Sequence, residues 1–151
     1  MKTIKTVDIA LVDGEGNVLL IERAKPPFMD RLVFPGGHVE DGETDLDAAV
    51  RELEEEVSIV IDRSLLKSLM KLDHSDRDPR PGKRESHVFS ANVARKVLIG
   101  ACAKSDARSV RTIPIKTLKP EMIGFDHYKV VVALRKLYDR EEVTHESTLS
   151  P

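Results

Sequence analysis

The sequence predicts an α/β fold in which a mixed β-sheet carries helices on both sides. Short β-rich runs alternate with two well-formed amphipathic helical patterns, and the chain contains no internal repeat. With 151 residues, 40% hydrophobic and 33% charged, the chain is long enough for one domain with a substantial core and short for two. We therefore expect one domain over residues 1–140 and a polar, flexible tail over residues 141–151.

The N-terminal part predicts a β-hairpin followed by a third strand. Thr6–Val12 and Asn17–Glu22 are β-rich runs, and the Asp-Gly-Glu-Gly sequence at residues 13–16 supplies a turn between them. Arg31–Phe34 is a further short strand. We expect the chain to turn sharply at residues 35–37, Pro-Gly-Gly, and to leave its backbone open to a ligand there.

An acidic helix over Thr44–Val57 is the strongest predicted element, and Thr44 or Glu43 can open it. Its apolar residues recur with a 4-3-4 spacing that places them on one face: Leu46, Val50, Leu53 and Val57. The same geometry gathers three carboxylates on another face: Glu52, Glu55 and Glu56. Carboxylates four residues apart repel one another by about 0.2–0.5 kcal/mol unless a cation lies between them. Oxygen ligands of this kind suit Mg²⁺ or Mn²⁺, although an acidic run alone is more often a solvated helix face.

The second half of the chain predicts further strands and a closing helix. The expected strands are Leu65–Lys71, Ser86–Val93, Val110–Ile115 and, as a partner for the second of these, Val97–Ala103. A proline-containing loop of mixed charge covers residues 73–85. Asp126 is a suitable N-cap for a helix that runs through Leu137.

Composition excludes several classes of function. A net charge of −2, with no basic run interleaved with aromatic residues, argues against a long nucleic acid as partner. No stretch approaches the roughly 18 apolar residues of a membrane span, and no signal peptide is recognisable. Cys102, expected to be buried, is the only cysteine, so no internal disulfide can form and a cytoplasmic location is expected.

The stretch from Gly37 to Ile59 resembles the Nudix box, G-x5-E-x7-R-E-U-x-E-E-x-G-U, where U is an apolar residue. The matching residues are Gly37, Glu43, Arg51, Glu52, Leu53, Glu55, Glu56 and Ile59. Ser58 stands where the pattern has Gly, and we expect an altered helix end there because Ser adopts the left-handed conformation less readily. The resemblance implies the Nudix-type α/β/α sandwich with a mixed sheet.

The resemblance also implies a metal-dependent hydrolase of diphosphate bonds. Its metal ligands would be the Gly37 carbonyl and the side chains of Glu52, Glu55 and Glu56, binding Mg²⁺ or Mn²⁺. The same three glutamates, together with Arg51, would be the catalytic residues, with Arg51 holding the glutamates in position. Either Glu55 or Glu56 would act as general base, and Glu121 is an outside candidate.

Residues 76–83 and 125–127, with the KPPF segment at residues 25–28, are similar to the ADP-ribose pyrophosphatase subgroup. This similarity implies hydrolysis of ADP-ribose to AMP and ribose 5-phosphate. Because guanidinium groups suit phosphate oxygens and aromatic faces hold bases, Arg23 and Arg80 are candidate phosphate or ribose contacts, and Phe28 is the candidate adenine platform.

Two other functions stay open at this point. One is a MutT-like pyrophosphohydrolase of nucleoside triphosphates, and the other is a non-catalytic nucleotide-sensing module. In each case the expected partner is a small nucleotide, with no nucleic acid and no membrane. A homodimer is expected from the family alone.

Overall fold

The computed structural model describes the backbone of residues 2–104 and 107–149 and the side chains of residues 2–104 and 109–140. Its strands are β1 (Ile4–Val12), β2 (Asn17–Arg23), β3 (Leu32–Val33), β4 (Gly36–His38), β5 (Lys67–Leu72), β6 (Arg84–Asn92) and β7 (Ala107–Pro114). Its α-helices are α1 (Asp45–Val57), α2 (Arg95–Ile99) and α3 (Tyr128–Leu149), and short 3₁₀ turns are η1 (Arg63–Leu65), η2 (Ile115–Thr117) and η3 (Pro120–Met122). No helix within these ranges is long and apolar enough to cross a membrane.

The strands form one mixed sheet. Its order is β3-β2-β1-β6-β5, with β4 added beside β1 and β7 beside β2. The central strands β1 and β6 run parallel, whereas the other strand pairs are antiparallel. The predicted hairpin is present, since the backbone N–H of Asp13 donates to the carbonyl of Asn17 at 3.0 Å.

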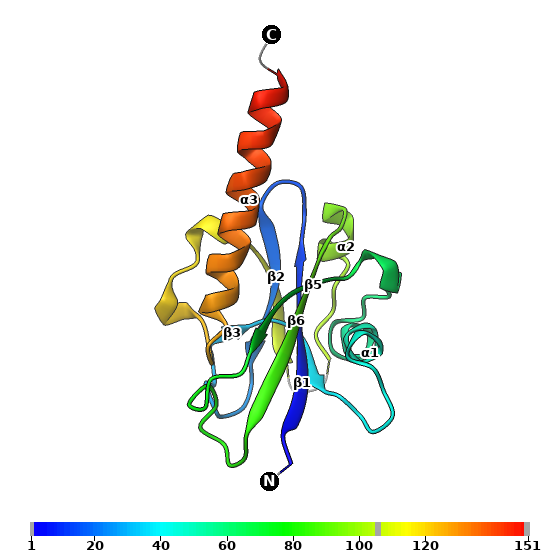
Figure 1. Cartoon of the computed structure of the whole chain (residues 1–151), viewed down its shortest axis with the longest axis vertical. Coiled ribbons are helices and arrows are strands. Elements are labelled where there is room, and N and C mark those ends of the chain that lie inside the picture. Colours follow the sequence, from blue (N-terminus) through cyan, green and yellow to red (C-terminus); the bar gives the residue numbers. More distant parts are fainter. Residues whose placement is uncertain (1, 105–106, 150–151) are drawn as a thin grey trace.

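Helices α1 and α3 lie on opposite faces of the sheet (Figure 1). Alternate residues of β1 enter different cores, because side chains of a strand point to its two faces in turn. Val7, Ile9 and Leu11 pack with α1, whereas Ala10 packs with α3. The predicted α/β/α sandwich is therefore confirmed.

Helix α1 begins and ends close to the predicted residues. The Thr44 hydroxyl accepts the backbone N–H of Asp47 at 3.1 Å and caps the helix. Ser58 closes it in the left-handed conformation, with φ +62°, and its N–H donates to the carbonyl of Glu54. The expectation of an altered helix end at Ser58 was wrong, because Ser58 adopts the left-handed conformation that Gly would adopt freely.

The strand predicted at Val97–Ala103 is wrong, since residues 95–99 form helix α2. Both edges of β6 are already occupied, by β1 on one side and β5 on the other, so no further strand can pair with it. Cys102, which follows α2, is exposed rather than buried.

Two other local expectations also change. Gly36 and Gly37, expected to lie in a sharp turn and not in a strand, are part of β4, in which Gly37 lies opposite Val7 of β1. The backbone of residues 141–149, predicted as a tail, continues α3; its flexibility stays a prediction.

Candidate active site

The carboxylates of α1 meet the glycines of β4. Glu56 Oε2 accepts the backbone N–H of Gly36 at 2.9 Å. A Cβ atom on Gly37 would lie 2.3 Å from the carboxyl carbon of Glu52, and one on Gly36 would lie 2.1 Å from the carbonyl oxygen of Val7. The space available therefore requires glycine at residue 36, where the clash is with backbone, and at residue 37 a side chain would displace the Glu52 carboxylate.

Burial and mutual repulsion raise the proton affinity of these carboxylates. Burial first, and then the negative charges of Glu52 and Asp8, raise the pKa of Glu56 to about 8, although the Gly36 N–H and the Arg23 charge oppose the shift. Burial is also the main cause that raises the pKa of Glu52. A cation placed between the two side chains would relieve both effects.

Arg51 fastens the acidic face of α1 to the loop before it. Its Nε and Nη2 donate to the two carboxylate oxygens of Glu43 at 2.8 and 2.9 Å, and Nη2 also donates to the carbonyl of His38. Its Nη1 lies 3.0 Å from Glu52 Oε1 and 3.1 Å from Glu55 Oε2, so the predicted pair with Glu55 is present. Hydrogen bonds from Arg51 lower the pKa of Glu43 to about 2.

Glu55 is the outermost of the three box carboxylates, with a side chain that is 58% exposed. Among the described residues, no three His, Cys, Asp or Glu side chains stand close enough together to form a ready-made metal cluster. The carboxylate and carbonyl oxygens at Glu52, Glu56 and Gly37 are nevertheless of the chemical type that binds hard divalent cations.

A cleft of about 220 Å³ opens beside this face, and Glu56, Gly36 and Gly37 form part of its wall. Phe125 forms another part, and three predicted substrate-binding residues gather around its ring. The guanidinium carbons of Arg23 and Arg80 lie 4.9 and 5.4 Å from the ring centroid, and the Phe28 ring lies 4.8 Å away. The structure thus brings together Arg23, Phe28 and Arg80, which are far apart in the sequence.

Two arginine–aspartate pairs order the proline-containing loop beside the cleft: one joins it to the residues before α3 and the other lies within the loop. Arg77 donates to both carboxylate oxygens of Asp126 at 3.0 and 3.1 Å. The Asp126 side chain, which the sequence suggested as a helix N-cap, therefore accepts hydrogen bonds from Arg77. Arg80 is similarly bound to Asp78, with Nη2 at 2.6 Å from Oδ2. Both aspartates are largely buried.

A buried network supports the Pro-Gly-Gly segment from below. The backbone N–H of Phe34 donates to Nδ1 of His127 at 3.1 Å, which leaves the ring proton on Nε2. That nitrogen lies 3.4 Å from Asp8 Oδ2, and the same oxygen accepts the Ser86 hydroxyl. The expectation of a structural His127 agrees with these contacts.

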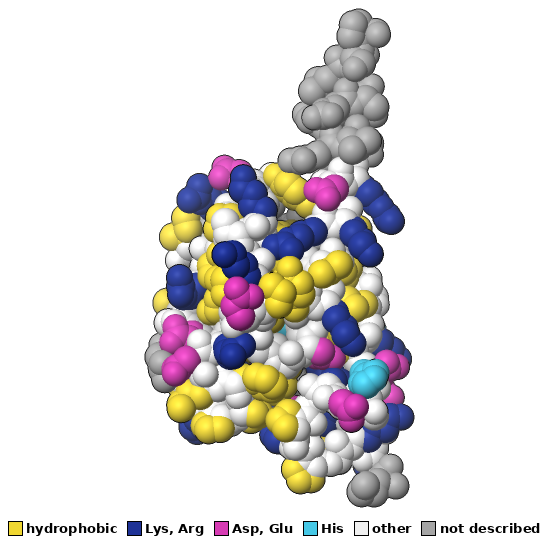
Figure 2. Space-filling model, turned by 90° about the vertical axis from the view of Figure 1, so that its left-hand side faces the viewer, with side chains coloured by type: hydrophobic (Ala, Val, Ile, Leu, Met, Phe, Trp, Pro, Cys, Tyr) yellow, Lys and Arg dark blue, Asp and Glu magenta, His cyan; other side chains and the backbone are white. Residues whose placement is uncertain are grey.

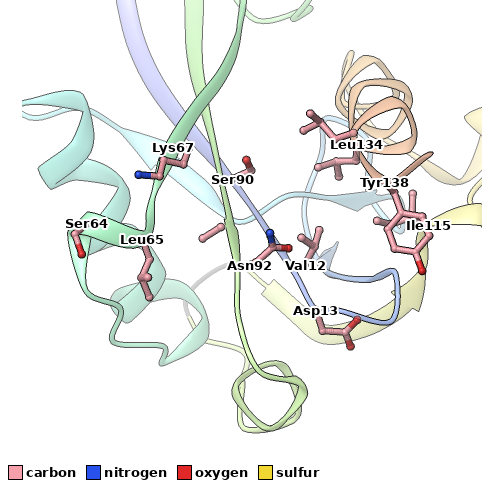
Figure 3. Close-up of a pocket in the computed structure, with 12 residues that line it drawn as sticks. Val12, Asp13, Ser64, Leu65, Lys67, Ser90, Asn92, Ile115, Leu134 and Tyr138 are labelled. Carbon is pink, nitrogen blue, oxygen red and sulfur yellow. The ribbon is translucent and has the colours of Figure 1, made fainter. Parts of the chain in front are cut away.

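A larger cavity of about 340 Å³ lies elsewhere, between α3 and η1 (Figure 3). Its lining includes Leu65, Leu134 and Tyr138, and its one carboxylate, Asp13, is already bound to the backbone of Glu15 and Asn17. This cavity lacks the carboxylates and arginines that the predicted chemistry requires.

Several residues of the cleft were missed or misplaced by sequence reasoning. Arg84, Phe125 and Asp8 line it. The FDH similarity was the signal for Phe125, and the basic composition of the proline-containing loop was the signal for Arg84, whereas Asp8 had none. Glu121, the outside candidate for general base, lies exposed in η3 and is not part of the cleft lining.

Comparisons with known proteins identify the family. The NUDIX domain family model matches residues 2–134. An ADP-ribose pyrophosphatase of Methanocaldococcus jannaschii is 34% identical over 123 residues, which are 80% of this chain and 67% of that protein. An 8-oxo-dGTP diphosphatase of Escherichia coli is 36% identical over 73 residues, 47% of this chain and 57% of that protein.

Solved structures share the fold. A MutT/nudix family protein from Enterococcus faecalis has a TM-score of 0.78 and 26% identity, covering 92% of this chain and 63% of that one. A second structure is that of the bifunctional NMN adenylyltransferase/ADP ribose pyrophosphatase of Francisella tularensis, solved with AMP and a Mn ion. It has a TM-score of 0.76 and 26% identity, and the match covers 91% of this chain and 42% of that one. The NUDIX domain of Shewanella oneidensis NrtR, solved with ADP ribose, has a TM-score of 0.77 at 22% identity, covering 90% and 88%. With a family match over most of its length and a carboxylate-bearing helix at the expected place, this chain belongs to the NUDIX domain family.

Proposed function

We propose that this chain hydrolyses ADP-ribose to AMP and ribose 5-phosphate with the help of a divalent metal ion. One observation carries the proposal: the cleft joins the Glu56 carboxylate and the Pro-Gly-Gly glycines to an aromatic ring flanked by arginines. Such a cleft suits a ligand that combines an anionic diphosphate with a planar base. The 34% identity to an ADP-ribose pyrophosphatase supports the same substrate.

The groups that would hold Mg²⁺ or Mn²⁺ are the Gly37 carbonyl and the carboxylates of Glu52, Glu55 and Glu56. A bound divalent cation would neutralise phosphate charge and make a bound water more acidic. The raised pKa values of Glu52 and Glu56 support this assignment, because a nearby positive charge is what two buried, repelling carboxylates need.

The protein's own side chains would position the catalytic carboxylates and the substrate, and one of them would deprotonate the attacking water. Arg51 holds Glu52 and Glu55 through a single nitrogen, Nη1, which fixes the spacing of the two carboxylates. We assign the general base to Glu55 rather than Glu56, because the Glu55 carboxylate, which Arg51 binds at Oε2, is 58% exposed to solvent water, whereas Glu56 is partly buried and its Oε2 accepts the Gly36 N–H. Phe125 and Phe28 would hold the adenine, and Arg23 and Arg80 would contact phosphate or ribose.

The test is product analysis with ADP-ribose, Mg²⁺ and a matched pair of variants. Glu55→Gln is expected to lose about 10²–10⁴-fold in kcat, the usual contribution of a general base. Glu54→Gln is the control, because Glu54 is an exposed neighbour on the same helix that is not among the carboxylates bound by Arg51. Equal turnover by Glu55→Gln and wild type would refute the assigned role of Glu55.

A triphosphate hydrolase is the second candidate, favoured by the 36% identity to an 8-oxo-dGTP diphosphatase over 73 residues. It would release pyrophosphate from nucleoside triphosphates, whereas the proposed activity releases AMP from ADP-ribose. Tight binding of ADP-ribose without any turnover would instead favour a sensing module. On the face in Figure 2, basic and acidic side chains are interspersed rather than gathered in a basic surface, which supports a small-molecule partner.

A further inference from the structure

Arg84 differs from every other buried polar side chain of the cleft. It begins β6, opposite Ile4 of β1, and its side chain is only 11% exposed. Within the part of the chain whose side chains are described, its Nε is the single buried side-chain nitrogen or oxygen that has no hydrogen-bond partner. A guanidinium donor in this condition has lost its water without gaining a replacement.

The nearest groups do not satisfy this donor. Asp78 Oδ2 lies 3.7 Å from Nε, beyond hydrogen-bond length, and that oxygen already accepts from Nη2 of Arg80. On the other side, Nη1 of Arg84 lies 3.5 Å from Nε2 of His38, at the limit of a hydrogen bond. Arg84 therefore retains donor capacity in the wall of the cleft.

The neighbouring arginines of the same loop are already committed. Arg77 uses Nε and Nη2 on Asp126, and Arg80 uses Nε and Nη2 on Asp78. An incoming phosphate would have to compete with a carboxylate for the Nε and Nη2 edge of either arginine, so of the two contacts proposed for Arg80 this geometry favours the one to ribose. At Arg84 it would face only a long contact to an aspartate that Arg80 already neutralises.

We propose that Arg84 binds a phosphate oxygen of the substrate on the side of the cleft away from Phe125. A chain of contacts leads from the aromatic end to Arg84 and beyond: Phe125 to Arg80, Arg80 to Asp78, Asp78 to Arg84, and Arg84 to His38. With the base on Phe125, Arg84 lies beside the phosphate that leaves with ribose 5-phosphate. The inference rests on the proposed function and adds a binding residue that the box motif does not contain.

The first experiment compares Arg84→Met with Arg95→Met, a control in which an exposed arginine outside the cleft is removed. Arg84→Met is expected to raise KM for ADP-ribose about 10–100-fold, the effect of losing charge-assisted hydrogen bonds, whereas Arg95→Met leaves it unchanged. The urea midpoint of Arg84→Met should equal or exceed that of wild type, because a buried unsatisfied charge is replaced by an apolar chain while Asp78 keeps Arg80. A KM within threefold of wild type overturns the proposal.

Product inhibition tests the placement of Arg84 along the cleft. Arg84→Met should weaken inhibition by ribose 5-phosphate at least tenfold more than inhibition by AMP. Equal weakening of the two inhibitors would overturn the placement away from Phe125. Arg84→Lys should recover little of the affinity, because an ammonium group does not reproduce the guanidinium Nε–H.

Calorimetric titration with inorganic pyrophosphate separates this inference from the proposed function. If wild type does not hydrolyse ADP-ribose, the proposed function fails, yet pyrophosphate binding still reports on Arg84. All titrations use one fixed Mg²⁺ concentration. The anion site at Arg84 is supported if wild type and Arg95→Met bind pyrophosphate and Arg84→Met does not. Equal affinity in all three proteins overturns it.

Discussion

The ion pair between Arg77 and Asp126 joins the proline-containing loop to the residues before α3. Removing this pair should lower the free energy of unfolding. Arg77→Met leaves the Asp126 carboxylate largely buried with no cation beside it. The two side chains are 6% and 10% exposed and share hydrogen bonds of 3.0 and 3.1 Å, so solvent cannot replace the lost partner. Breaking a buried pair of this kind costs about 3–5 kcal/mol.

Urea denaturation monitored by circular dichroism measures this cost directly. For a domain of this size, about 3–5 kcal/mol corresponds to a fall in Tm of roughly 6–20 °C. The double variant Arg77→Met/Asp126→Asn should regain part of the loss, because it removes the stranded charge as well as its partner. The difference between the double variant and the sum of the single variants gives the coupling energy of the pair.

A loss below about 1 kcal/mol for Arg77→Met would refute this reasoning, since that is the range of an exposed ion pair. It would mean that water reaches Asp126 once Arg77 is gone. The matched control is Arg63→Met, which removes an ion pair to Asp47 whose partners are 57% and 47% exposed. That control should change stability by no more than about 1 kcal/mol.

Three further results are expected. Ser58→Gly should stabilise the protein by about 1 kcal/mol, or roughly 2–4 °C in Tm, because Gly adopts the left-handed helix end without strain; an unchanged Tm would contradict this. Gly37→Ala should reduce kcat at least about 10²-fold, because the alanine Cβ would occupy the position of the Glu52 carboxylate. A crystal structure of this variant in which Glu52 has not moved would contradict the steric cause. In metal-free buffer with a chelator, the contribution of Glu56 to stability should be complete below pH about 4.5 and lost as the pH rises through about 8, because its pKa is raised in the folded state. Glu56→Gln should remove that decline in urea midpoint, and saturating Mg²⁺ should oppose it; a wild-type midpoint that stays level from pH 5 to pH 9 would count against the raised pKa.

Local sequence patterns were sufficient for the elements whose structure depends on near neighbours. The 3.6-residue period of α1, its Thr44 cap and the hairpin turn before Asn17 all appear as predicted, because each is decided by contacts within a few residues. The same period placed Glu52 and Glu56 on the side of α1 that meets β4. Composition and motif also selected Arg23, Phe28 and Arg80, whose common position around one ring agrees with a shared role, although their contacts to substrate remain a prediction.

Other features depended on which distant segments meet. The apolar run at residues 97–103 could have extended a sheet, but both edges of β6 were taken, so the chain formed α2 instead. The glycines at residues 36 and 37 joined β1 as a strand because β1 offered a free pairing edge there, which no local pattern reveals.

The sequence by itself determined the family and the carboxylate face of α1. It could not say which arginines remain able to bind a ligand. Arg77 is satisfied by a residue 49 positions away and Arg80 by one only two positions away, whereas Arg84 is left with an unpaired donor. Only the tertiary structure decides this, because whether a buried charge is satisfied depends on the few ångströms that separate it from partners anywhere in the chain.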